Sequence, residues 1–179
     1  MSASLLGAAA PGFDRPLEML EACHGRIAKQ CDTLDKLLAH LPTHGADTQA
    51  QQAARAVRAY FDTAAIHHHD DEERNLFPLL EQVGAAGACD LVETLTLEHD
   101  ELALLWRRLR LSLQQIEAGA SPSLDEALTQ RFIALNRTHL EFENAHVLPL
   151  ARQVLGPVEI ERLGRAMSAR RGVPFAAQS

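Results

Sequence analysis

The sequence has few aromatic side chains, few cysteines and no long apolar run. Aromatic residues make up 4% of the 179 residues, whereas hydrophobic residues make up 46%. Because strands favour aromatic and β-branched side chains, this balance favours an all-α protein, and the hydrophobic content excludes a disordered chain. The length suits one domain. The lack of a run of about 18 apolar residues argues against a transmembrane helix.

Charge and cysteine content limit the partners and the cellular compartment that the sequence predicts. The net charge is −7 and no basic stripe is present, so a nucleic-acid backbone is not an expected partner. The cysteines, Cys23, Cys31 and Cys89, are odd in number and lack Cys-x-x-Cys spacing, which indicates neither a disulfide framework nor a zinc ribbon. Since residues 1–13 lack the basic start of a secretion signal, these features predict a cytoplasmic protein with no membrane partner.

Apolar residues recur at helical spacing in four long segments separated by short breaks. These segments are residues 16–41, 47–83, 90–118 and, beginning at Ser123 or Leu124, 123–154. The short connections predict an up-down-up-down antiparallel four-helix bundle. Asp14 and Asp47 are expected to cap the first two helices. Pro78 lies inside the second segment, so a kink or local break is expected near Asn75.

The chain is therefore expected to contain one bundle with a short appendage at each end. Residues 1–13 are predicted to form an N-terminal tail, and residues 14–155 the four-helix bundle. Residues 156–179 are predicted to hold a short fifth helix at 158–170 and a loose tail from Arg171.

An eleven-residue frame that occurs twice is the most informative motif. Each copy contains a histidine, a glutamate four residues later and a proline ten residues later: His68, Glu72 and Pro78 in the first copy, and His139, Glu143 and Pro149 in the second. On a helix, four residues are about 40° past a full turn and about 6 Å along the axis. The imidazole and carboxylate of each pair can therefore point at one metal site.

Two lone histidines, His24 and His99, lie in the apolar stripes of the first and third segments. Counting residues along each helix places them at the height of the two His–Glu pairs, nearer the end that holds the loop 84–87. A lone histidine in an apolar stripe is usually a core residue, and a His–Glu pair is often exposed. Six inward-facing polar residues at one height are better explained by a metal, because buried carboxylates require compensation. The predicted ligands are His24, His68, Glu72, His99, His139 and Glu143.

Four imidazoles and two carboxylates suit a pair of first-row transition metals better than calcium, which prefers oxygen ligands alone. The two glutamates come from different helices, so each could bridge both metals. This arrangement would leave coordination positions for water or a small ligand.

These residues resemble the hemerythrin-like, or HHE cation-binding, family over residues 17–155. The resemblance rests on His24, the segment 68–78, the pair Glu98-His99, and the segment from His139 through Glu143 to Pro149. It implies a four-helix bundle with two iron ions, oxo- or hydroxo-bridged, held by the six predicted ligands with Glu72 and Glu143 as the bridges. Zinc or manganese are alternative occupants.

The sequence departs from the oxygen-carrying members of this family at one position. Those members have a second histidine four residues after the third-helix histidine, where this chain has Ala103. His146 is a candidate for a further ligand or for a boundary residue. His69 lies 100° around the helix from His68 and is expected beside the site or exposed, although some relatives use this position. The acidic residues expected to orient imidazole N–H groups are Glu73, Glu98 and Glu141.

The resemblance implies a protein that binds or senses O₂, NO or iron. A non-enzymatic binder is favoured, because the sequence shows no catalytic nucleophile and no phosphate-binding loop. Apolar residues expected near the site favour a small diatomic ligand. Two alternatives stay open: a di-iron redox enzyme, such as a peroxidase or an NO-handling activity, and a zinc-loaded or empty bundle with a structural role.

Overall fold

Helices account for all the regular secondary structure in residues 11–120 and 123–175, the part of the chain that the computed structural model describes. The all-α prediction is confirmed. The helices are α1 (Pro16–His44), α2 (Thr48–Phe61), α3 (Ala64–Asp71), η1 (Glu72–Leu76), α4 (Phe77–Gln82), α5 (Ala88–Glu117), α6 (Glu126–Phe142), η2 (Glu143–Val147), α7 (Leu148–Val154) and α8 (Pro157–Arg170). The elements η1 and η2 are π-helical turns.

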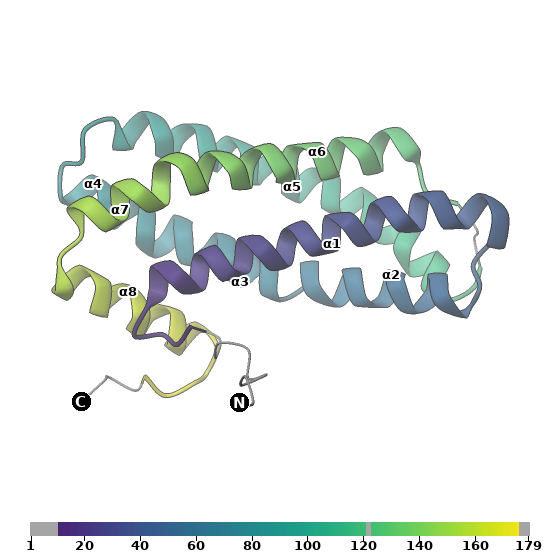
Figure 1. Cartoon of the computed structure of the whole chain (residues 1–179), viewed down its shortest axis with the longest axis horizontal. Coiled ribbons are helices and arrows are strands. Elements are labelled where there is room, and N and C mark those ends of the chain that lie inside the picture. Colours follow the sequence, from purple (N-terminus) through teal and green to yellow (C-terminus); the bar gives the residue numbers. More distant parts are fainter. Residues whose placement is uncertain (1–10, 121–122, 176–179) are drawn as a thin grey trace, which may run out of the picture.

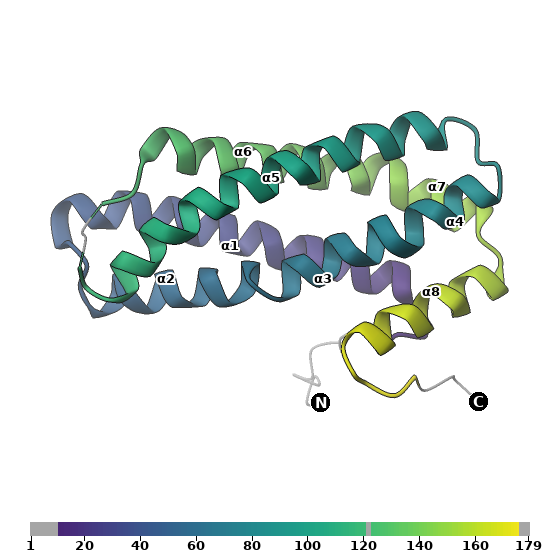
Figure 2. The same cartoon turned by 180° about the vertical axis from the view of Figure 1, so that it is seen from behind.

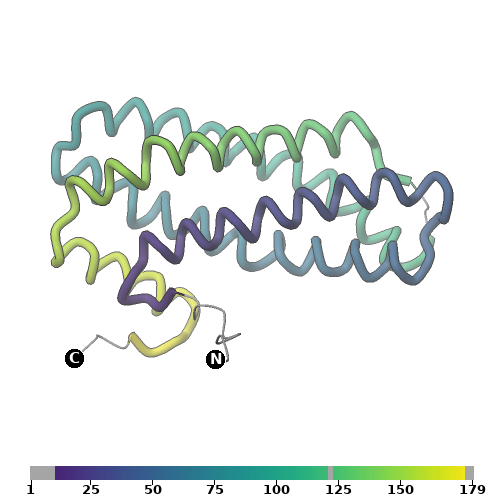
Figure 3. Tube along the Cα trace, viewed as in Figure 1, coloured from purple at the N-terminus to yellow at the C-terminus, as the bar shows by residue number. Residues whose placement is uncertain are grey.

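These elements form four long columns and one short helix at an end (Figure 1). Column one is α1, column two is α2 to α4, column three is α5, and column four is α6 to α7. Columns one and three each pack against columns two and four, so the four columns close into a bundle. The chain can be followed through the columns in Figure 3. The short helix α8 packs against α1, α3 and η1. None of the helices in the described residues is long and apolar enough to cross a bilayer.

The apolar core falls into two clusters on either side of a polar layer. Along α1, Leu20 belongs to one cluster and Ile27 to the other, and His24 lies between them. Along α5, Leu95 and Leu102 divide in the same way around His99. The 3.6-residue period of a helix keeps these side chains on one inward stripe, so the histidines are buried together with the leucines. The polar layer is therefore built into the core.

Both glutamates of the repeated frame begin a π-helical turn. The N–H of Phe77 bonds to the carbonyl of Glu72, and the N–H of Leu148 bonds to the carbonyl of Glu143, in each case five residues back. The frame's proline is the second residue of the α-helix that follows each turn, where a missing N–H is tolerated. The kink or break predicted near Asn75 is a wider turn in a continuing helix.

Several helix ends differ from the prediction. The first helix runs to His44 with Pro42 in its last turn, and its N-cap position is Arg15 where Asp14 was predicted. Asp47 caps α2 as predicted, accepting from the N–H of Ala50 at 2.8 Å. The fourth long helix begins at Glu126, because Asp125 supplies the cap. The second predicted helix is interrupted at residues 62–63.

The two ends of the described chain dock on the bundle. Gly164 of α8 lies so close to Phe13 that an added Cβ would be 2.0 Å from the Phe13 carbonyl oxygen. Arg171, predicted to begin a loose tail, instead donates to Asp71 at 2.7 Å. That prediction was wrong at Arg171, because a buried carboxylate far away in the sequence anchors this end. The rest of the predicted N-terminal tail, residues 1–10, and residues 176–179 lie outside the described residues.

Candidate metal centre

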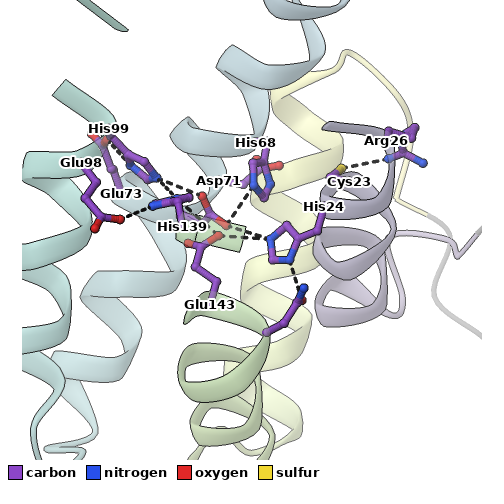
Figure 4. A network of polar contacts seen from close by, with 12 residues as sticks. Cys23, His24, Arg26, His68, Asp71, Glu73, Glu98, His99, His139 and Glu143 are labelled. Carbon is purple, nitrogen blue, oxygen red and sulfur yellow. Dashed lines mark hydrogen bonds and ion pairs between the residues drawn. The ribbon is translucent and has the colours of Figure 1, made fainter. Parts of the chain in front are cut away.

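The structure brings the six predicted ligands into one layer of the bundle. All of them except Glu72 are labelled in Figure 4. They come from all four columns: His24 from α1, His68 from α3, Glu72 from η1, His99 from α5, His139 from α6 and Glu143 from η2. Each is between 0 and 3% exposed. The heights counted along the helices in the sequence therefore agree with the structure.

One group of donor atoms joins columns one, two and four. His24, His68, Glu72 and Glu143 have donor atoms that all lie within 4.8 Å of one another. The Nε2 of His24 lies 3.3 Å from an oxygen of Glu143, and the Nε2 of His68 lies 3.3 Å from Oε1 of Glu72. Two imidazole nitrogens and two carboxylates thus converge on one point.

A second group lies beside the first and contains His69, His99 and His139. The Nε2 atoms of His99 and His139 are 3.0 Å apart, and the ring of His69 stacks on that of His99 with centroids 4.0 Å apart. His69, expected beside the site or exposed, therefore takes part in this second group.

The two glutamates lie between the groups. Glu72 directs Oε1 at His68 and Oε2 at His99, at 3.3 Å and 3.6 Å. Oε2 of Glu143 is 3.3 Å from His24 and 3.4 Å from His139. Each carboxylate is thus placed to reach two cations, one in each group.

Polar partners behind the imidazoles fix their orientation. The Nδ1 atoms of His99 and His139 donate to Glu73 and Glu98, both at 2.7 Å. These two outer carboxylates were predicted. With Nδ1 protonated, each Nε2 carries its lone pair toward the centre, which is the tautomer that binds a metal.

The remaining outer partner was missed by the sequence reasoning. The Nδ1 of His24 donates to Oδ1 of Asn144 at 2.7 Å, and within the described residues no imidazole bonds to Glu141, the third predicted outer carboxylate. An asparagine one residue after the second glutamate carries no clear metal signal by itself. His146 is exposed and its ring lies against Phe142, 4.6 Å between centroids, so the structure does not bring it into the centre.

The polar atoms that face the centre have few hydrogen-bond partners. Among the described residues, the buried atoms without one include Nε2 of His24, both ring nitrogens of His68, Oε2 of Glu72 and both carboxylate oxygens of Glu143. Leaving such a group unpaired costs about 1–3 kcal/mol, more when it is charged. Unpaired lone pairs of nitrogen and oxygen that converge on one point fit a bound cation.

The protonation of the centre also suits a cation. Burial lowers the pKa of His68 and His69 well below the usual range, so both imidazoles are neutral at pH 7. Burial, together with the charge of Glu143, raises the pKa of Glu72 to about 8. Burial lowers the pKa of His24, but the Glu143 and Glu72 carboxylates outweigh it and raise the pKa to about 10. Without a metal, His24 and Glu72 therefore keep their protons at pH 7, at the place where a bound cation would supply positive charge.

Asp71 is a buried carboxylate beside the centre that does not face it. An acidic run such as residues 70–73 is usually a solvated helix face, so the local sequence does not predict a buried role for Asp71. It is 0% exposed and forms ion pairs with Arg170 and with Arg171, the latter at 2.7 Å. Arg170 also donates to Asn75 at 2.6 Å. These contacts tie the end of α8 to the column that carries His68 and Glu72.

An aromatic groove lies next to the second group of donors. Its volume is about 560 Å³, and its lining includes His69, Phe61, Trp106 and Phe132, with Ala103 and Leu104 among the residues on α5. Phe61 contacts both other aromatic rings, with centroids 4.9 and 5.0 Å away. The lining is mostly apolar but also includes Asp100, Arg107 and Asn136.

Comparison with known proteins gives two matches. The family model described as "Hemerythrin HHE cation binding domain" matches residues 15–151. An uncharacterized protein of Haemophilus influenzae is 31% identical over 161 residues, which cover 90% of this chain and 92% of that protein. The matched range contains all six predicted ligands and His69.

Proposed function

The chain belongs to the hemerythrin HHE cation-binding domain family, and on this basis we propose that it is a non-haem di-iron protein that binds or senses O₂, NO or iron. The observation that carries the proposal is the pair of donor groups that share Glu72 and Glu143. A single ion would need only one group. Two groups joined by two carboxylates provide for two ions.

The proposed ligand set has one member beyond the six predicted from the sequence. His24 and His68 would hold one metal, and His69, His99 and His139 the other, while Glu72 and Glu143 would contact both. His69 thereby offers a fifth imidazole from α3 in place of one on α5, where Ala103 stands. Its contact with the ring of His99 supports this assignment.

Iron is proposed because the donors are imidazole nitrogens and carboxylate oxygens with no thiolate. Zinc and manganese accept the same donors and are the alternative occupants. When bound, a di-iron centre supplies one-electron redox chemistry and a coordination position for a small ligand. The protein's own residues orient the imidazoles through Glu73, Glu98 and Asn144, and the apolar clusters on both sides restrict water.

The bundle proposed to carry this centre has the up-down-up-down order predicted from the sequence. The pairing of column one with columns two and four, and of column three with the same two, supports that order. Residues 14–155 would form the bundle domain. A cytoplasmic location remains a prediction from composition.

Spectroscopy of the reduced, iron-loaded protein tests the function. Exposure to O₂ or NO should produce new absorption bands that disappear again when the gas is removed. Glu93→Gln, at an exposed position of α5 that is not a proposed ligand, should retain the bands, whereas Glu72→Ala should abolish them. Absence of any spectral change, with two irons bound, would contradict ligand binding and favour the structural alternative. Irreversible oxidation with turnover of peroxide would favour the redox enzyme.

A further inference from the structure

The outward face of α5 carries a row of exposed leucines, Leu97, Leu104 and Leu111, which are 63, 55 and 60% exposed. Large hydrophobic residues with this exposure are few in the described residues, and one of them is Ile66 of α3, which is 52% exposed. Ile66 and Leu104 both line the aromatic groove. Figure 2 shows α3 and α5, the helices that carry these four residues, on the same side of the bundle. Clustered exposed apolar side chains mark an interaction surface.

The spacing of the three leucines suits contact with another helix. Seven residues turn a helix by about 700°, only about 20° short of two full turns, so the leucines form a nearly straight line about 21 Å long. They do not contribute to the inward face of α5, where Leu95, Leu102 and Leu109 are buried. This second apolar stripe has no partner within the described part of the chain.

Two basic side chains and one acidic side chain near Leu104 have no charged partner within the described residues. Arg107 and Arg108 follow it, and Asp100 precedes it by one turn. Every other arginine in residues 11–120 and 123–175 makes a hydrogen bond or an ion pair, whereas Arg107 and Arg108 make none there. Asp100 is likewise exposed and without an ion pair in those residues. The face thus has an acidic end and a basic end around a central leucine.

We propose that α5 of a second copy of this chain packs antiparallel on this face, with the two-fold axis at Leu104. In that arrangement Leu97 faces Leu111 of the second copy, and Asp100 faces Arg107 and Arg108 of the second copy. A parallel pairing would instead bring like charges together, which is unfavourable. Because Leu104 lines the groove, the second copy would also cover the groove beside His69. The interface does not depend on which metal the centre holds.

The molar mass in solution tests this proposal. Sedimentation equilibrium between about 1 and about 100 μM should give twice the chain mass of 19.6 kDa for the wild type. Leu104→Glu should give the monomer mass, since it places two carboxylates together on the axis. Val158→Glu, at a site that is 74% exposed on α8, is the matched control and should remain dimeric. Helical circular dichroism should be unchanged in both variants.

A charge exchange tests the antiparallel geometry. Asp100→Arg alone, and Arg107→Asp with Arg108→Asp, should each weaken self-association at least tenfold. An equimolar mixture of these two variants should form a mixed dimer at the wild-type concentration, because opposite charges then face each other at both ends. A monomeric wild type up to about 100 μM would overturn the proposal, as would a Leu104→Glu variant that stays dimeric. A wild-type dimer whose exchanged variants do not recover on mixing would overturn the antiparallel arrangement.

Discussion

The ion pairs between Asp71 and α8 give a prediction about stability that can be worked from the structure. The variant is Arg170→Ala combined with Arg171→Ala. The Asp71 side chain is 0% exposed, and the two arginine side chains are 15% and 20% exposed. Removing both partners leaves a buried carboxylate uncompensated, which costs about 3–5 kcal/mol of unfolding free energy.

The reverse substitution should cost less. Asp71→Ala removes the buried charge, and Arg170 and Arg171 are exposed enough to turn toward solvent. We expect a loss of about 1–3 kcal/mol, mostly from lost hydrogen bonds. Adding Asp71→Ala to the double arginine variant should therefore restore part of the lost stability, which is the expected sign of coupling in a mutant cycle.

Unfolding of the metal-free protein by urea and by heat measures these differences. For a chain of this length each kcal/mol shifts Tm by about 2–4 °C, so the double arginine variant should melt about 6–20 °C below wild type. The reasoning is refuted if that variant loses less than about 1 kcal/mol, or if Asp71→Ala is equally costly and the triple variant recovers nothing.

Three further predictions concern the centre and its surroundings. Glu98→Gln should weaken metal binding about 10–100-fold in a chelator competition, while Glu93→Gln, exposed on the same helix, should have no effect. The metal-free protein should lose stability as pH rises from 6.5 toward 10, because the raised pKa values of His24 and Glu72 favour the protonated folded state at the lower pH; a melting temperature that rises over this range would contradict the assignment. Burial raises the pKa of Tyr60 to about 12, so ultraviolet titration of this only tyrosine should show no phenolate near pH 10 in the folded protein.

The meeting of the six predicted ligands in one buried layer could be predicted from the sequence, because helical periodicity fixes which side chains face inward. His69 could not be found in this way. It lies 100° around α3 from His68, which suggests a position beside the site. In a bundle, however, a helix faces two neighbours, so His68 can face His24 of column one while His69 stacks on His99 of column three.

Features set by contacts between distant residues were not predictable. The helix break after Phe61 coincides with hydrogen bonds from Trp106 and Arg110 to Asp62, which come from another column. The ion-pair partners of Asp71 are Arg170 and Arg171, about a hundred residues away. The sequence around each residue does not indicate such distant partners. The proline of each frame indicated a perturbed helix, but the five-residue bond that makes the turn π-helical is a property of the folded backbone.

Metal stoichiometry tests the two-ion centre most directly. Protein saturated with Fe(II) without oxygen and then desalted should hold two irons per chain, and Mössbauer spectra after oxidation should show a coupled pair. Because Glu72 and Glu143 contact both donor groups, Glu143→Ala should lose both irons together, whereas the nearby Glu141→Ala should keep two. A wild type that holds one iron per chain would contradict the shared centre. A Glu143→Ala variant that keeps one iron would contradict it as well.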